Sequence, residues 1–388
     1  MPDAATLARA LWIDRLSPVS DRERIDLYLS AFLAESRRRH VTNPHVSRLY
    51  DQASDFVLQG GKRLRPRLCL ASFRILTGRM TRPPRPIWVA AACLEIFHAF
   101  MLIHDDLIDG SVLRRDRATL HEAIRNELPE PDQTGSRKHA TDLALVAGDL
   151  LCALGMRMLS RSGLDDPTQA KAQRLLADVL LETGVGQALD ILYETCPLDD
   201  LTESQIIEAY QRKTARYSIS GPLVLGSIMA KSPARVGRSL SRFGDLLGFG
   251  YQVQNDLEAL AMDLTYGDHA DLDTGKRTLV LWLAYQNGSA RSRREINEAL
   301  GMPVGLDRRQ RLLSLIQKTG AIEECKLRLD LLRREASELL DDTAIDTNQR
   351  RGFLSLMHIF APSVATPHAG LLAKVVAFPL DASTAPLT

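Results

Sequence analysis

Residues 86–109 read PIWVAAACLEIFHAFMLIHDDLID, an apolar run that ends in three aspartates. Pro86 suits the first turn of a helix, because its ring holds the helical φ and no N–H is needed there. We therefore expect one helix over 86–109. At ~1.5 Å per residue it would be roughly 35 Å long, long enough to wall a deep pocket.

Helical patterns cover most of the remaining chain. The expected helices span 141–160, 168–194, 202–216, 234–261 and 275–285, with further amphipathic helices over 304–360. Strand-like alternation is nearly absent, and aromatic residues make up 5% of the 388 residues. With 45% hydrophobic residues the chain can bury a large core. These features predict a single all-α bundle rather than an alternating β/α fold.

Three segments fall outside this main pattern. Residues 1–45 read as one or two amphipathic helices with a charged face. Residues 122–140 contain prolines, glycine and polar side chains, and we expect a polar loop there. Residues 362–388 are rich in Ala, Pro and Thr, so disorder is expected, with an apolar strap around 371–378 as the alternative.

The bulk composition argues against several classes of protein. The formal net charge is +1, so no global field attracts nucleic acid or an anionic membrane. The five cysteines are widely spaced without a CxxC pair, so we expect a cytoplasmic protein without disulfides or zinc. No signal peptide is visible, and weakly polar stretches such as 219–230 are too short to span a bilayer. We therefore expect no transmembrane segment.

The aspartates at the end of the long helix form the first candidate site. Asp105 and Asp109 are one helical turn apart and share a face, with Asp106 to one side. Their like charges repel unless water or a cation lies between them, and the flanking residues are strongly apolar. Carboxylate oxygens completed by phosphate oxygens would form a Mg²⁺ site. The alternative is an ordinary acidic helix end paired with surface cations.

Basic residues flank this cluster in the sequence. Arg114, Arg115 and Arg117 follow it closely, and arginine beside a metal site suits a diphosphate. Upstream, residues 60–67 read GGKRLRPR, where two glycines let the backbone approach a ligand. Lys62 and Arg65 could converge there on one anion. The alternatives are an exposed ion-pair network and a solvated basic turn.

His98 lies roughly two turns before Asp105 on the long helix. It is either a core histidine or a side chain that faces the anion site, and the sequence leaves both readings open.

A second acidic cluster lies about 150 residues after the first. Residues 251–258 read YQVQNDLE, and Asp256 is followed by acidic residues at 258, 263 and 268. Lys213 and Thr214 precede it, and residues 275–278 read GKRT. Lys213 could reach phosphate through its long stem or extend to the surface. A solvated acidic face is the alternative for the cluster.

Taken together, these motifs resemble those of the trans-isoprenyl diphosphate synthases. The matching elements are GGKRLRP (60–66), His98, DDLID (105–109), RR (114–115), KT (213–214), YQVQND (251–256) and GKRT (275–278). They occur in that family's order and at its spacing, across about residues 50–285.

The resemblance implies an all-α isoprenoid synthase bundle around a central cavity, usually homodimeric, with residues 46–361 as the catalytic domain. Its members condense isopentenyl diphosphate with an allylic diphosphate in the presence of two or three Mg²⁺ ions. The isopentenyl double bond attacks C1 of the allylic cation that ionisation leaves, and a proton is then lost.

The resemblance also implies roles for individual residues. The residues carrying the chemistry would be Asp105, Asp109, Arg114 and Lys213. The metal ligands would be Asp105, Asp106, Asp109 and Asp256. The allylic diphosphate would contact Arg114, Lys213, Thr214, Gln252 and Lys276. The isopentenyl diphosphate would contact Lys62, Arg65, His98 and Arg115.

The second motif departs from the family's usual DDxxD. Asn255 stands where a carboxylate is expected and Ala259 replaces the final aspartate, so a third metal should bind more weakly. Two alternatives follow: a family member that cyclises its substrate or prenylates another acceptor, and a non-catalytic partner subunit of a synthase. The intact isopentenyl site favours elongation.

Product length is expected to depend on residues one turn before the first aspartate. Phe100 and Met101 lie five and four positions before Asp105, and DDLID carries no insertion. This pattern resembles the short-chain members. Geranylgeranyl diphosphate (C20) is favoured over farnesyl diphosphate (C15), because Met101 is flexible and narrower than an aromatic residue.

Overall fold

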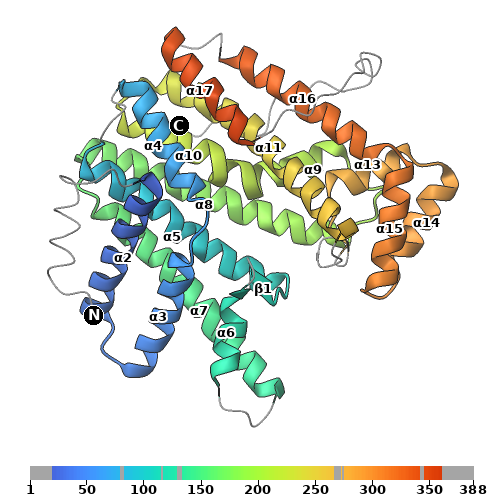
Figure 1. The fold of residues 1–388 in the computed structure, drawn as a ribbon, viewed down its shortest axis with the longest axis horizontal. Helices are drawn as coiled ribbons and strands as arrows, with labels where there is room; N and C mark the ends of the chain where they lie inside the picture. The colour runs from blue at the N-terminus through green and yellow to red at the C-terminus, as the bar shows by residue number, and fades with distance from the viewer. Residues whose placement is uncertain are drawn as a thin grey trace. The chain divides into compact units, whose positions relative to one another are not determined.

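The computed structural model describes residues 20–78, 83–114, 117–128, 133–265, 272, 275–340 and 345–360. Within these ranges the only strands are β1 (Leu113–Arg114) and β2 (Arg117–Ala118), an antiparallel pair with Leu113 opposite Ala118. All other regular structure there is helical, which confirms the expected all-α class (Figure 1). The expected C-terminal tail and the start of the N-terminal segment lie outside the described residues.

The chain divides into two compact units. The first comprises Met1–Arg74 and Arg79–Gln173, and the second comprises Ile75–Gly78 and Arg174–Thr388. The helices of the first unit are α2 (Asp21–His40), α3 (Pro44–Leu58), most of α4 (Leu64–Thr77), α5 (Arg85–Ile108), α6 (Leu120–Glu127) and α7 (Gln133–Ser160). Helix α8 (Asp166–Glu194) begins in the first unit and continues in the second.

Helix α5 forms the core of the first unit. It follows Pro84, and its end is capped by Asp109, whose N–H donates to the Asp105 carbonyl over 2.8 Å. These bounds confirm the helix that the sequence predicts. Helix α7 lies along α5 (Figure 1), and α7 carries glycine where the helices meet. A Cβ at Gly155 would lie 2.9 Å from the Phe97 ring, so a larger residue would force the helices apart.

The expected polar loop at 122–140 is wrong for most of its length. Helix α6 occupies Leu120–Glu127, and α7 begins at Gln133. Leu120 and Ile124, one turn apart, are 3% and 4% exposed, which gives α6 a buried face. Ala140 is likewise buried in the first turns of α7. Burial against neighbouring helices therefore outweighs the polar composition that predicted a loop.

The second unit holds the remaining helices. They are α9 (Glu203–Tyr210), the π-helix η1 (Gln211–Ser220), α10 (Gly221–Met229), α11 (Ala234–Thr265), α13 (Leu279–Asn287), α14 (Ala290–Leu300), α15 (Leu306–Lys318), α16 (Ala321–Leu339) and α17 (Thr347–Phe360). Helix α11 is central, because η1, α10 and α16 all pack against it. The expected helices over 304–360 are confirmed within the described ranges. The expected continuous helix over 202–216 is wrong in its second half, where η1 replaces the α-helix.

Two of the described helices are long and apolar enough to cross a membrane by length and composition. They are α5 and residues 135–160 of α7, and 72% of the apolar window of α5 is buried inside the structure. That burial is typical of a core helix in a folded domain. The apolar window of α7 is 44% buried, so part of this helix presents apolar side chains to solvent.

Candidate functional site

The first acidic cluster separates into two kinds of carboxylate. Asp106 is 1% exposed and receives hydrogen bonds from Arg114, with Nε at 2.7 Å and Nη2 at 2.5 Å from Oδ1. Burial raises the pKa of Asp106, and the Arg114 guanidinium opposes that rise. Asp105 is 26% exposed, and its carboxylate lies 3.7 Å from Arg114. Asp106 therefore holds Arg114, while Asp105 and Asp109 remain on the part-exposed face of the helix end.

The hairpin after α5 places Arg114. The Thr119 hydroxyl is buried and donates to the Ser111 carbonyl over 2.8 Å, and the Thr119 N–H donates to the Val112 carbonyl over 3.1 Å. These bonds close the base of the hairpin beside the aspartates. Arg115, which the sequence pairs with Arg114, lies outside the described residues.

The basic loop lies between α3 and α4 in the same unit. Lys62 is exposed, and Arg65, in the first turn of α4, is 8% exposed. Between them the buried Arg63 donates to Glu95 of α5 over 3.0 Å. Glu95 precedes the part-exposed His98 by one helical turn. The structure thus ties the loop that carries Lys62 and Arg65 to the helix that carries His98.

Phe100 and Met101 are both part-exposed, one turn before Asp105. The Phe100 ring meets the His104 ring edge-on, with centroids 4.8 Å apart. The predicted chain-length residues therefore lie on the same helix as the acidic cluster, next to it.

In the second unit three predicted residues form one hydrogen-bond network. The Thr214 hydroxyl donates to Gln252 Oε1 over 2.8 Å, and Gln252 Nε2 donates to Asp256 Oδ1 over 2.8 Å. The Tyr210 hydroxyl donates to the other oxygen of Asp256 and accepts the Leu279 N–H over 2.8 Å. The network joins α9, η1, α11 and the first residue of α13, which directly follows the GKRT segment that contains Lys276.

Tyr210 is a residue that the sequence reasoning missed. Burial, the largest cause, and the Asp256 charge raise the pKa of Tyr210 well above the usual value. The hydroxyl therefore stays protonated and can donate a hydrogen bond to Asp256. Asp256 is 5% exposed and both its oxygens accept hydrogen bonds. No local pattern marks Tyr210, because its partners come from distant parts of the sequence.

Lys213 lies on η1 beside a second residue that the sequence reasoning missed. Its Nζ donates to Asp190 Oδ2 on α8 over 2.5 Å, and the two side chains are 23% and 22% exposed. A signal was available in the sequence: Gly186 stands inside the helix just before Asp190, and an isolated glycine in a helical pattern often has a packing reason.

The glycines that face η1 explain its position. A Cβ at Gly186 would lie 2.2 Å from the Lys213 backbone nitrogen. A Cβ at Gly248 of α11 would lie 2.4 Å from Ala215 Cα. Both contacts are far inside normal packing distance, so only glycine permits this approach. Helices α8 and α11 therefore pack closely against the part of η1 that bears Lys213 and Thr214. π-Helical turns occur frequently at functional sites.

The departure in the second motif is visible in the structure. Asn255 is part-exposed, whereas its neighbour Asp256 is turned into the buried network. Gln254 donates to Glu258 over 2.7 Å on the outer face of α11. The side chains at 263 and 268 lie outside the described residues.

The donor set fits Mg²⁺ that is shared with a phosphate ligand. Among the described residues no group of three His, Cys, Asp or Glu side chains converges on one point. A metal cage made of protein alone is therefore absent from that part of the chain. Asp105 and Asp109 offer hard oxygen ligands one turn apart, and Mg²⁺ is commonly held by one or two carboxylates plus water and substrate phosphate.

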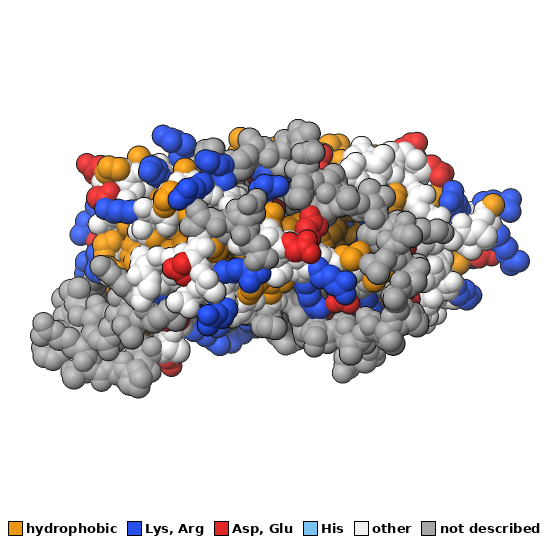
Figure 2. Space-filling view, turned by 90° about the horizontal axis from the view of Figure 1, so that it is seen from above, with side chains coloured by type: hydrophobic (Ala, Val, Ile, Leu, Met, Phe, Trp, Pro, Cys, Tyr) orange, Lys and Arg blue, Asp and Glu red, His pale blue; other side chains and the backbone are white. Residues whose placement is uncertain are grey.

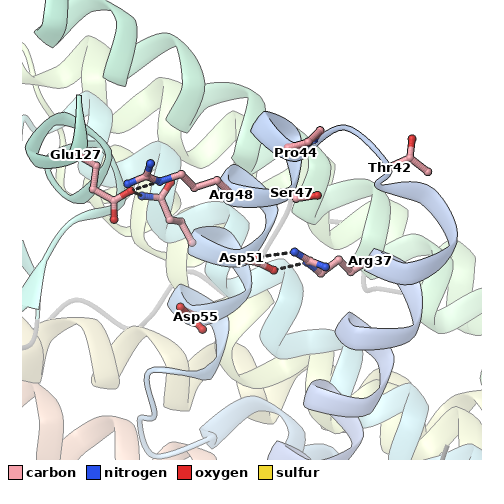
Figure 3. A pocket seen from close by; sticks show the side chains of 9 residues that line it. Arg37, Thr42, Pro44, Ser47, Arg48, Asp51, Asp55 and Glu127 are labelled. Atoms are coloured by element: carbon pink, nitrogen blue, oxygen red, sulfur yellow. Dashed lines mark hydrogen bonds and ion pairs between the residues drawn. The ribbon is translucent and has the colours of Figure 1, made fainter. Parts of the chain in front are cut away.

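A separate pocket opens at the junction of α2, α3 and α6. It encloses about 590 Å³, and its lining includes Arg37, Arg48, Asp51 and Glu127 (Figure 3). Arg37 forms two hydrogen bonds to Asp51, at 2.5 and 2.7 Å, and Arg48 donates to Glu127 over 2.7 Å. The pocket contains none of the predicted site residues.

Comparison with known proteins adds an independent finding. Residues 46–315 match the family model of the polyprenyl synthetases. A geranylgeranyl diphosphate synthase of Sulfolobus acidocaldarius is 30% identical over 241 residues, which cover 61% of this chain and 66% of that protein. A geranylfarnesyl diphosphate synthase of Aeropyrum pernix is 26% identical over 316 residues, covering 80% and 92% of the two chains.

Solved structures show the same fold. A geranylgeranyl pyrophosphate synthase of Corynebacterium glutamicum, complexed with isoprenyl diphosphate and magnesium, has a TM-score of 0.76 and 28% identity. The match covers 88% of this chain and 98% of that one. A polyprenyl synthase of Caulobacter crescentus, complexed with calcium and isoprenyl diphosphate, has a TM-score of 0.67 at 22% identity and covers 88% and 97%.

Proposed function

This chain belongs to the polyprenyl synthetase family and is a prenyltransferase, and from that premise we propose that it joins isopentenyl diphosphate to an allylic diphosphate. The product is a short-chain trans-prenyl diphosphate. One observation carries the proposal: α5 has acidic ligands and Arg114 at its end, and the GGKRLRP loop is tied to its middle by Arg63 and Glu95. One helix thus serves both a metal-diphosphate site and a second anion site.

In the first unit, the allylic diphosphate would be bound through Mg²⁺ and Arg114. We assign Asp105 and Asp109 to Mg²⁺, and Asp106 to holding Arg114. Bound Mg²⁺ would neutralise charge on the departing diphosphate. These carboxylates would hold two ions, and a third ion would bind more weakly because Asn255 lacks the charge of an aspartate.

The diphosphate contacts in the second unit come from Lys213, Thr214, Gln252 and Lys276. Lys213 Nζ donates to Asp190 Oδ2 over 2.5 Å. Thr214 and Gln252 are held by the network that ends at Tyr210. These partners fix the side chains in advance, which lowers the entropy that substrate binding has to overcome.

Isopentenyl diphosphate is held by Lys62, Arg65, His98 and Arg115. A cyclase has no second diphosphate to bind, so this set favours elongation over cyclisation. A non-catalytic scaffold would have no need of either anion site.

The reaction breaks the C1–O bond of the allylic substrate and releases diphosphate. The isopentenyl double bond attacks C1, and the new carbon–carbon bond leaves a cation that loses one proton to the departing diphosphate. The lysines and arginines match the charge that develops on the leaving group. None of them acts as a general base.

The product is proposed to be geranylgeranyl diphosphate, with farnesyl diphosphate as the shorter possibility. Phe100 and Met101 lie one turn before Asp105, where a growing chain along α5 would meet them. Met101 is narrower and more flexible than an aromatic side chain, which leaves room for the longer product.

The protein is proposed to be a cytoplasmic homodimer without a membrane-spanning segment. Apolar side chains are exposed along two long helices: Leu145, Val146, Leu150 and Met156 on α7, and Leu181, Val185, Ile191 and Leu192 on α8. A second copy would cover such faces. Acidic and basic side chains are interspersed among the described residues on the face in Figure 2, which does not favour a nucleic-acid partner.

The test is incubation of the purified chain with Mg²⁺, isopentenyl diphosphate and, separately, dimethylallyl, geranyl or farnesyl diphosphate. Mass spectrometry before and after phosphatase treatment identifies the product. We expect a C20 or C15 prenyl alcohol only after phosphatase, and its loss in Asp105→Ala and in Arg115→Ala. Hydrocarbon or cyclic alcohol formed without isopentenyl diphosphate would contradict the proposal, as would no turnover by the wild-type chain.

A further inference from the structure

The loop that carries Lys62 has an unusual backbone. Gly60 and Gly61 have φ angles of 99° and 112°, and Arg63 has a φ angle of 47°. Arg63 is one of two non-glycine residues with positive φ in the described part of the chain. Such a conformation is unfavourable for a residue with a Cβ and persists only where surrounding contacts hold it.

The contacts of the Arg63 side chain stabilise this backbone conformation. Its guanidinium is 3% exposed, with Nε 2.7 Å from Asp26 of α2 and Nη1 3.0 Å from Glu95 of α5. Glu95 is itself 4% exposed, whereas Asp26 is 33% exposed. A buried arginine of this kind needs its carboxylate partners, because an unpaired buried charge is costly. The left-handed backbone at Arg63 is therefore maintained by two ion pairs.

The anchoring of Arg63 affects the residues on either side of it, Lys62 and Arg65. With Arg63 turned inward, Lys62 is exposed, and Arg65 lies in the first turn of α4, which begins directly after the anchored residue. Arg67 further secures the loop, since its N–H donates to the Arg63 carbonyl and its side chain to the Lys62 carbonyl, both over 3.2 Å. Glu95 lies one turn before His98 on α5. Arg63 thus joins the elements that carry Lys62, Arg65 and His98.

We propose that Arg63 is a positioning residue for the isopentenyl diphosphate site, and that Asp26 tunes this site from α2 through Arg63. The proposal rests on the function proposed above. Arg63 does not contact the diphosphate, because its guanidinium is buried between two carboxylates. Its role is to hold Lys62 and Arg65 in the geometry that binds one of the two substrates.

A purely structural role for Asp26 is the competing explanation, and α2 offers a matched control. Asp21 lies on the same helix and is 32% exposed, against 33% for Asp26. It forms two hydrogen bonds with Arg74, at 2.5 and 2.9 Å, and so also anchors α2. Arg74 lies away from the loop in sequence, at the other end of α4. The two aspartates therefore differ mainly in whether their partner lies in the basic loop.

The variants are expected to fold, since other contacts hold α2 in place. Ile25, Leu29 and Leu33 are buried at 0%, 0% and 2% exposure. The Tyr28 ring stacks on Trp88 of α5 with centroids 6.4 Å apart. A neutral amide at position 26 or 21 removes one charge and leaves this apolar contact intact.

The experiment compares the full-length wild type, Asp26→Asn and Asp21→Asn in steady-state assays with Mg²⁺. Each substrate is varied in turn, and thermal unfolding is measured for all three proteins. We expect Asp26→Asn to raise the KM for isopentenyl diphosphate on the order of tenfold. The KM for the allylic substrate should stay within about twofold, and Asp21→Asn should change neither KM. Both variants should lose similar thermal stability.

Glu95→Gln provides a second variant at the other carboxylate, and it should raise the same KM. An unchanged KM for isopentenyl diphosphate in Asp26→Asn, or an equal rise of this KM in Asp21→Asn, overturns the positioning role. The proposed function still stands in that case, provided that the wild type turns over. Absence of wild-type turnover overturns both. The two failures are therefore distinguishable.

Discussion

Asp245 illustrates how a single half-buried carboxyl links chemistry to stability. It lies on α11 and accepts a hydrogen bond from the Ser220 hydroxyl, over 2.7 Å, at the end of η1. Burial raises its pKa to about 6, against the lowering effects of the Arg216 charge and the Ser220 hydroxyl. The folded protein therefore binds a proton on Asp245 at a higher pH than the unfolded chain does.

The sign of the resulting pH dependence follows from linkage. Between the ordinary aspartate pKa and about 6, the folded state holds more protons at this site, so this contribution to stability grows as pH falls and is lost as pH rises through about 6. The wild type should therefore lose unfolding free energy between pH 5 and pH 7 because of Asp245. We expect this loss to be smaller in Asp245→Asn, by on the order of 1 kcal/mol. Urea unfolding of both proteins at the two pH values measures this difference.

Asp142→Asn is a suitable control, because Asp142 is exposed and pairs with Lys138 on the surface of α7. It should leave the difference between the two pH values close to that of the wild type. An identical difference in Asp245→Asn and the wild type would contradict the assignment of this slope to Asp245.

Other residues of the site are also defined by their partners. Arg114 is held by Asp106, Lys213 by Asp190, and Asp256 by Tyr210. In each pair at least one side chain was predicted from a motif to bind substrate or metal, and its partner determines where that side chain lies. The motif therefore identifies the chemistry, and the partner supplies the orientation.

At the scale of elements, η1 is the most informative segment. Its backbone is approached by Gly186 of α8 and Gly248 of α11, at distances that exclude any side chain. The close approach brings Thr214 within hydrogen-bond distance of Gln252, 2.8 Å between the bonded atoms. The position of Lys213 and Thr214, the proposed diphosphate contacts on η1, therefore depends on glycines in other helices.

We expect Gly248→Ala to weaken allylic diphosphate binding. The added methyl would lie 2.4 Å from Ala215 Cα, so η1 must move away from α11 and carry Thr214 with it. The KM for the allylic substrate should rise on the order of tenfold, with a stability loss of about 1–3 kcal/mol from overpacking. Steady-state kinetics and urea unfolding measure the two effects.

Gly250→Ala tests the same helix without the close contact. Its Cβ would lie 3.5 Å from Leu329 Cδ2, which is ordinary packing distance. This variant should keep the wild-type KM and remain as stable or become slightly more stable, since alanine favours helix over glycine. Equal kinetic effects of the two substitutions would argue against a positioning role for Gly248.

At the scale of the whole molecule, the exposed apolar faces of α7 and α8 bear on assembly. Leu181 and Leu192 of α8 are 68% and 62% exposed. Covering apolar surface is favourable by about 25 cal/mol per Å². These faces are consistent with the proposed homodimer.

We expect Leu181→Arg to shift the protein from dimer toward monomer. The charge would be desolvated in the interface, whereas in the monomer it would remain in water. Light scattering across a range of concentrations measures the change. Val304→Arg is the control, because Val304 is 67% exposed and belongs to the loop before α15 rather than to α7 or α8. A wild-type protein that is monomeric at all concentrations would contradict the dimer.

Much of the fold could be predicted because its signals are local. The apolar run and the proline at 86 predicted α5 to within one residue at either end. The motif order predicted the family, which the match over residues 46–315 confirms. The 122–140 segment and the π-helix were missed, because the burial of Ile124 and the close approach of Gly248 depend on packing between helices and not on local composition.

The amino-acid sequence by itself determined the helical class, the acidic and basic motifs and the departure at Asn255, since these depend on residue type and short-range spacing. Tertiary structure alone decided that Asp106 holds Arg114, that Tyr210 completes the Asp256 network and that Arg63 turns inward between Asp26 and Glu95. The physical reason is the same in each case. A hydrogen bond or buried ion pair between distant residues exists only after packing has brought them together and removed water from around them.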